Sequence, residues 1–153
     1  MQKLSNQILD LRELEKLSTT LSKDISVGDI YLFQGELGAG KTTFVRLLIN
    51  NLYLLNNLPK PASIVSPTFP ILITYDLNPL QIYHYDLYRI QNFKELEELD
   101  FFENLNKNIT FIEWPEMLIN LPFNKKHYLI NLDMISETKR KINISINKYS
   151  NEF

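Results

Sequence analysis

Hydrophobic residues along the chain recur with two different spacings, one typical of helices and one typical of strands. Leucines spaced three and four residues apart predict an amphipathic helix over about residues 9–23. The same spacing from residue 41 to about residue 56 predicts a second amphipathic helix, and residues 94–104 predict a third, acidic one. Each helix is expected to bury its apolar face against the rest of the protein.

Short apolar runs rich in β-branched and aromatic residues predict strands. These runs cover residues 30–33, 71–75, 81–88, 109–112, 128–135 and 141–148. The second and third runs flank a proline-containing turn and predict a hairpin, and the last two predict a C-terminal antiparallel pair. Strands that alternate with helices, together with two hairpins, predict an α/β fold with a mixed, partly antiparallel central sheet.

Composition limits the class of protein further. The 153 residues, 44% of them hydrophobic, fit a single domain over residues 1–153 with a sizeable core. The absence of cysteine and the presence of only two histidines exclude disulfide scaffolds and argue against a zinc site. A net charge of −2 argues against a protein that holds nucleic acid unaided. No stretch approaches the ~18 apolar residues of a membrane span or forms a signal peptide, so we expect a cytoplasmic protein without membrane contact.

A glycine-rich segment gives the strongest indication of function. Residues Gly35–Thr42 match the phosphate-binding pattern G-x-x-x-x-G-K-[ST] and hold three of the chain's four glycines, which argues against a chance match. Glycines permit a positive φ, so backbone N–H groups can surround phosphate oxygens at a helix N-terminus. Lys41 would pair with the β- and γ-phosphates, and Thr42 would offer its hydroxyl to Mg²⁺. The segment predicts a P-loop NTPase-like three-layer domain that binds ATP or ADP with Mg²⁺.

Two carboxylates are candidates to complete such a site. Glu113 follows the predicted strand 109–112, at the strand end where α/β sheets bind ligands. Asp86 lies in an aromatic strand, where a buried acid needs a partner. A structural role is the alternative for each: Asp86 as the ion-pair partner of Arg89, and Glu113 as the cap of a helix that begins at Pro115.

Two further features are open to both a functional and a structural interpretation. The proline-rich loop 66–70 contains Thr68, whose hydroxyl could sense a γ-phosphate through its metal or could belong to an ordinary turn. His84 is expected to be a packed or hydrogen-bonded strand histidine rather than a catalytic group.

Four segments together resemble the TsaE family of bacterial P-loop ATPases, also called YjeE. They are Gly35–Phe44, Ser66–Phe69, His84–Arg89 and Ile112–Trp114, in the family's order and at similar spacing. The resemblance implies a part in forming N6-threonylcarbamoyladenosine at position 37 of tRNAs that read codons beginning with A. It implies an ATPase, weak on its own, that acts on the TsaB–TsaD complex rather than as the transferase and contacts tRNA indirectly or weakly.

The resemblance also implies roles for individual residues. Thr42 and Glu113 would bind Mg²⁺, Asp86 would be needed for hydrolysis, and Thr68 would behave as a switch residue. The residues implied in catalysis are Lys41, Asp86 and Glu113. Those implied in nucleotide binding are Gly35, Gly38, Ala39, Gly40, Lys41, Thr42, Thr43, Thr68 and Arg140.

The sequence departs from the family at three positions and leaves two other functions open. Leu14 and Ser18 stand where the family often has threonine and glycine, which concerns the base-side contacts, and a glycine expected near Asp100 is absent. A small-molecule kinase is one alternative, although four arginines do not make an arginine-rich lid. The other alternative is a nucleotide-dependent binding switch with negligible turnover.

Overall fold

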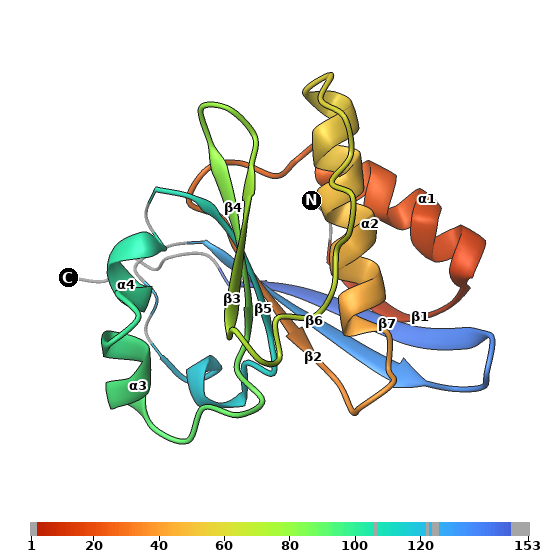
Figure 1. The fold of residues 1–153 in the computed structure, drawn as a ribbon. Helices are drawn as coiled ribbons and strands as arrows, with labels where there is room; N and C mark the ends of the chain where they lie inside the picture. The colour runs from red at the N-terminus through yellow and green to blue at the C-terminus, as the bar shows by residue number, and fades with distance from the viewer. Residues whose placement is uncertain (1–2, 106, 122, 124–125, 148–153) are drawn as a thin grey trace.

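The computed structural model describes residues 3–105, 107–121, 123 and 126–147, which form a seven-stranded sheet with helices on both faces (Figure 1). The strands are β1 (Leu4–Asp10), β2 (Ile30–Gln34), β3 (Leu72–Asp76), β4 (Gln81–Asp86), β5 (Ile109–Glu113), β6 (His127–Met134) and β7 (Lys139–Asn147). The helices are α1 (Leu11–Ser22), α2 (Lys41–Leu55), α3 (Phe93–Glu97), α4 (Phe101–Asn104) and a short 3-10 helix, Glu116–Leu118.

The strands follow the order β1-β7-β6-β2-β5-β4-β3 across the sheet. The central strands β6, β2, β5 and β4 are parallel, while β3, β7 and β1 are antiparallel to their neighbours. Parallel strands end at the same edge of a sheet, and Glu113 is accordingly paired with Phe33 on one side and Asp86 on the other. The predicted α/β fold with a mixed, partly antiparallel sheet is confirmed, and both predicted carboxylates lie at the carboxyl edge of its central strands.

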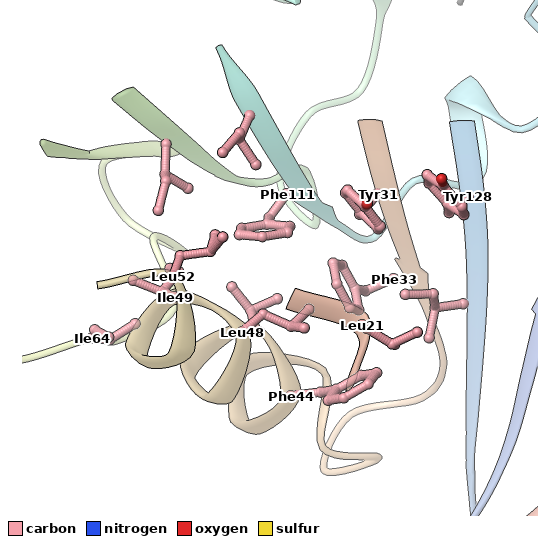
Figure 2. Packing of buried hydrophobic residues seen from close by; sticks show 14 of the residues in the cluster. Leu21, Tyr31, Phe33, Phe44, Leu48, Ile49, Leu52, Ile64, Phe111 and Tyr128 are labelled. Atoms are coloured by element: carbon pink, nitrogen blue, oxygen red, sulfur yellow. The ribbon is translucent and has the colours of Figure 1, made fainter. Parts of the chain in front are cut away.

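Two hydrophobic clusters hold the helices to the sheet. Helices α1 and α2 cover one face, and α3 and α4 cover the other (Figure 1). Under α2, the ring of Phe33 packs edge-on against Phe44 and Phe111, and Tyr31 stacks on Tyr128 with ring centroids 4.5 Å apart (Figure 2). Each fully buried side chain of this kind contributes ~1.5–3 kcal/mol. This core fixes α2 against β2 and therefore fixes the ends of the loop that joins them.

The two long helices begin in different ways. At α1, the Asp10 carboxylate accepts a hydrogen bond from the Glu13 N–H at 2.9 Å, and the Glu13 carboxylate accepts one from the Asp10 N–H at 2.8 Å. This capping box satisfies N–H groups that the helix itself leaves unpaired. Helix α2 instead follows Gly40, at φ 103°, and no side chain caps it. Its N-terminus is therefore available to an anion.

The structure departs from the sequence prediction in several places. Strand β1 was not predicted, and the first helix starts only after it, at Leu11. The single helix predicted over 94–104 is wrong: two short helices are separated at Asp100, whose φ of 50° is left-handed. Strand β4 ends at Asp86, two residues before the predicted end of the 81–88 strand. Lys148, included in the last predicted strand, lies outside the described residues.

Among the described helices, none has the length and apolar character needed to cross a membrane.

Candidate functional site

The glycine-rich loop Gly35–Gly40 leaves the carboxyl end of β2 and leads directly into α2. Its three glycines all have positive φ, of 150°, 79° and 103°. A Cβ atom on Gly35 would overlap the carbonyl oxygen of Leu132 on β6, whereas one on Gly38 would make only ordinary contact with Met134. Glycine is therefore required at Gly35 by space as well as by backbone conformation.

Lys41, the first residue of α2, is buried beneath this loop. Its ammonium donates hydrogen bonds to the carbonyls of Gly35 at 2.7 Å and Glu36 at 2.9 Å. The ring of Trp114 lies against it, with Nζ 3.8 Å from the ring centroid. Burial lowers the pKa of Lys41, and the negative charges of Glu113, Glu116 and Asp86 oppose that shift. An ammonium removed from water in this way interacts strongly with an anion that reaches it.

Glu113, the last residue of β5, is almost fully buried and uses its two oxygens differently. Oε2 accepts a hydrogen bond from Thr42 Oγ1 at 2.8 Å, and Oε1 lies 2.8 Å from Nε2 of His84 on β4. The alternative role for Glu113, as the cap of a helix at Pro115, is wrong because the 3-10 helix there has no side-chain cap.

Asp86, the last residue of β4, is also buried and is surrounded by donors. Its Oδ2 accepts hydrogen bonds from the hydroxyls of Ser66 and Thr68, the latter at 3.0 Å, and its Oδ1 accepts one from the Tyr88 N–H at 3.0 Å. The alternative ion pair with Arg89 is wrong, because no salt bridge joins Asp86 to Arg89 among the described residues; the Arg89 guanidinium lies 5.2 Å from the ring centroid of Phe69. The proline-rich loop is therefore tied to the sheet edge through Asp86.

Arg140, on β7, donates hydrogen bonds to the backbone of the glycine-rich loop. Its Nε donates to the Ala39 carbonyl at 2.9 Å, and its other nitrogens donate to Gly38 at 3.4 Å and to Ser136 at 2.7 Å. A residue 101 positions away in sequence thus fixes the loop's last turn before α2.

Two clefts lined by described residues open beside the loop. The first, about 340 Å³, is the phosphate cleft, and it is lined by Leu37, Gly38, Gly40, Lys41, Thr42, Thr43, Ser66, Thr68, Asp86, Tyr88, Glu113 and Trp114. The second, about 540 Å³, is the side cleft, and it is lined by Leu9, Asp10, Leu11, Arg12, Leu14, Gly40, Thr43, Glu137, Thr138 and Arg140. Gly40 and Thr43 line both, so a ligand with two parts could occupy both clefts past Thr43.

The structure brings most of the predicted site residues together. The lining of the phosphate cleft includes the predicted cation, the predicted hydroxyls and both predicted carboxylates: Lys41, Thr42, Thr43, Thr68, Asp86 and Glu113. Arg140 lines the side cleft instead, on the other side of Gly40. Sequence reasoning gave no site role to Ser66, which bonds Asp86, or to Trp114, which covers Lys41. Ser66 was detectable as a hydroxyl two residues before Thr68, but its partner lies on another segment.

A strand, a glycine-rich loop and a helix at the carboxyl edge of a mixed sheet define this molecule as an α/β protein with a P-loop NTPase-like fold. A crystal structure of YdiB from Bacillus subtilis has the same fold, with a TM-score of 0.62 over 97% of this chain and 90% of that one, at 21% sequence identity.

Sequence comparison narrows the class to one family. The family described as "Threonylcarbamoyl adenosine biosynthesis protein TsaE" matches residues 8–142. A protein of Rickettsia felis named tRNA threonylcarbamoyladenosine biosynthesis protein TsaE is 40% identical over 88% of this chain and 75% of its own length. The protein of that name from Aquifex aeolicus is 30% identical over 94% of this chain and 98% of its own. The chain belongs to the TsaE family, as the resemblance of its four segments indicated.

Proposed function

We propose that this chain is a Mg²⁺-dependent ATPase that supports formation of N6-threonylcarbamoyladenosine at position 37 of tRNAs reading codons that begin with A. Its family takes its description from threonylcarbamoyl adenosine biosynthesis. The observation that carries the proposal is the 2.8 Å contact between Thr42 Oγ1 and Glu113 Oε2, next to the buried ammonium of Lys41. A hydroxyl and a carboxylate held beside a cation suit phosphate-bound Mg²⁺.

The residues present fit Mg²⁺ better than a metal held by protein alone. In the described part of the chain, no group of three or more histidine, cysteine, aspartate or glutamate side chains could hold a metal ion. Mg²⁺ is commonly bound by one or two protein ligands, with phosphates and water completing its shell. Thr42 and Glu113 are a pair of that kind, and the ion would neutralise phosphate charge when bound.

The chain's own residues would then bind phosphate and direct a water molecule. Lys41 would exchange its two carbonyl partners for phosphate oxygens, while backbone N–H groups at the start of α2 would bind the rest of the anion. Asp86 lines the phosphate cleft, so its carboxylate would be able to accept a hydrogen bond from a water molecule in the cleft and orient it. Correct orientation and proton acceptance of this kind contribute about 10²–10⁴-fold to a rate.

The side cleft is suited to the nucleoside of ATP or ADP. It shares Gly40 and Thr43 with the phosphate cleft, and leucines at positions 9, 11 and 14 supply apolar surface for a planar base. Leu14 stands where the family often has threonine, so apolar contact would replace a hydroxyl contact there. Arg140 lies between this cleft and the loop backbone.

Exposed apolar side chains beside the phosphate cleft support a protein partner, which we propose is the TsaB–TsaD complex. Leu37 is 84% exposed, Phe69 83% and Tyr88 62%, on the glycine-rich loop, the proline-rich loop and the segment after β4. Exposed apolar groups gathered at one place mark interaction sites. Because the cleft lining includes Lys41 as a cation but no arginine, hydrolysis is expected to be weak until the partner binds.

Reconstituted tRNA modification tests the proposal. TsaB, TsaD, the carbamoyl-adenylate-forming enzyme, substrates and tRNA are combined with the wild-type chain or with Lys41→Ala, Asp86→Asn or Lys60→Ala. Mass spectrometry of digested tRNA counts the modified nucleoside, and released phosphate is measured in parallel. We expect repeated turnover with the wild type and with Lys60→Ala, a control at an exposed lysine outside both clefts. Lys41→Ala should abolish turnover, and Asp86→Asn should lower phosphate release by about 100-fold or more.

Each other outcome identifies a different function. Equal modification with and without the chain would overturn its role on the TsaB–TsaD complex. Modification that needs the chain without any phosphate release would favour a binding switch, and transfer of the γ-phosphate to a metabolite would favour a kinase.

A further inference from the structure

His84 is a fully buried polar side chain that lies behind the phosphate cleft and does not line it. It is the fourth residue of β4, and Asp86 and Glu113, whose Cα atoms are paired, end β4 and β5 in the same part of the sheet. The imidazole therefore sits one layer below the cleft, against the carboxylate that faces Thr42.

The contact between His84 and Glu113 has a defined direction. Nε2 of the imidazole lies 2.8 Å from Oε1 of Glu113, and a carboxylate only accepts hydrogen bonds, so Nε2 carries the proton and donates. Nδ1 is buried and has no hydrogen-bond partner in the described part of the chain. The ring of Tyr75 on β3 packs against the imidazole with ring centroids 6.4 Å apart, which restricts its rotation.

This contact determines which way the carboxylate points. With Oε1 held by His84, Oε2 remains toward Thr42 Oγ1, 2.8 Å away. Without the imidazole N–H, a buried Oε1 would lose its donor and the carboxylate would turn to find another. The pair that we propose for Mg²⁺ would then no longer be held in place.

We propose that His84 is a positioning residue that sets the affinity of the Thr42–Glu113 pair for Mg²⁺. This inference rests on the proposed function, because it concerns the metal that accompanies the nucleotide. Groups that hydrogen-bond a metal ligand typically change metal affinity by about 10–100-fold when removed. His84 does not itself line the phosphate cleft and reaches it only through Glu113, so we expect nucleotide binding without metal not to depend on it.

Three variants separate positioning from packing. His84→Phe keeps a ring in the core and removes the donor. His84→Gln keeps an N–H at a reach similar to Nε2. Tyr75→Phe is the matched control, since it changes the neighbouring ring without touching Glu113.

The measurement is ADP binding at increasing Mg²⁺ and in EDTA, followed by the fluorescence of Trp114, the chain's single tryptophan, which lines the phosphate cleft. Thermal unfolding with ADP and Mg²⁺ is a second readout. We expect His84→Phe to bind ADP as the wild type does in EDTA, and to need about 10–100-fold more Mg²⁺ for half of the metal's effect. His84→Gln should recover most of the wild-type response, and Tyr75→Phe all of it.

Two results would overturn the inference while leaving the proposed function in place. One is a wild-type Mg²⁺ response in His84→Phe. The other is a loss in His84→Gln as large as in His84→Phe, which would mean that ring packing, not the donated hydrogen bond, is what matters. A wild-type chain that binds no ADP under any condition would overturn the proposed function, and this inference with it.

Discussion

Individual residues in this protein are held by partners from distant segments. His84, Asp86 and Glu113 are nearly or fully buried polar side chains. Every hydrogen bond described for the carboxylates of Asp86 and Glu113 comes from a residue outside the strand that carries the carboxylate. Burying such groups without partners costs several kcal/mol. Their presence at one edge of the sheet therefore depends on the whole constellation being formed together.

Glycine at position 35 is expected to be the least replaceable residue of the loop. Gly35→Ala would place a Cβ on the Leu132 carbonyl at a positive φ, and should lower the free energy of unfolding by more than about 2 kcal/mol. Gly38→Ala meets only the flexible end of Met134 and should cost about 1 kcal/mol, mainly from its φ. Urea unfolding of both variants measures the difference, and equal losses would contradict the steric argument.

The sequence predicted the part of the site that is one continuous segment better than the contacts that join residues of different segments. The glycine-rich loop is one uninterrupted stretch whose pattern carries its chemistry, so Lys41 and Thr42 were predictable from it. The hydroxyl of Ser66 on Asp86 and the imidazole of His84 on Glu113 join different segments. Such contacts depend on strand register, which local residue patterns do not specify.

At the scale of elements, the sequence did not predict the edge strand β1 or the interruption between helices α3 and α4. Strand β1 is mostly exposed and has an irregular register with β7 between Leu4 and Gln7, so it lacks the alternation that identifies a strand. The acidic segment 94–104 has continuous helical composition, but the chain turns left-handed at Asp100. A single residue in that conformation ends a helix regardless of the propensity of its neighbours.

The break between α3 and α4 leads to a prediction about stability. Asp100 has a left-handed φ of 50°, a conformation that raises the energy of a residue with a Cβ atom but not that of glycine. Asp100→Gly should therefore raise the free energy of unfolding by about 1 kcal/mol and raise Tm by about 2–4 °C. Asp100→Val should lower both. Calorimetric unfolding measures the change, and a less stable Asp100→Gly variant would show that the aspartate side chain compensates its backbone cost.

At the scale of the molecule, the arrangement of strands could not be derived from local pattern. The sequence predicted the two antiparallel pairs and the mixed sheet, but not that β6 would pair with β2 on the side opposite β5. This order brings Arg140, on β7, to the glycine-rich loop. Packing of the two faces decides strand order, and it involves residues that are far apart in sequence.

Buried tyrosines make the whole molecule sensitive to alkali. Burial raises the pKa of Tyr85 to about 12, and burial together with the Asp29 charge raises the pKa of Tyr31 as well. Tyrosines in the unfolded chain ionise near pH ~10. Unfolding therefore releases protons from these tyrosines above pH ~10, so their contribution to stability is constant below pH ~10 and falls as the pH rises toward their folded-state pKa values.

Each such tyrosine should reduce the free energy of unfolding by ~1.4 kcal/mol per pH unit in that window. Urea unfolding at stepwise pH, with phenolate absorbance recorded in parallel, measures the slope. Tyr85→Phe should make the slope shallower by the contribution of one tyrosine, ~1.4 kcal/mol per pH unit. An unchanged slope in that variant, with all phenolate appearing before unfolding, would contradict the assignment.

The pairing of β1 with β7 also constrains the order in which the molecule is completed. The Asn6 N–H donates to the Asn143 side chain across 137 residues of sequence. Strand β1 is therefore synthesised well before β7, the strand with which it pairs. Contacts of such large sequence separation close late, because a long loop must be ordered first. Arg140 lies on β7 as well, so its hydrogen bond to the Ala39 carbonyl, 101 positions earlier in sequence, forms only after β7 has been synthesised.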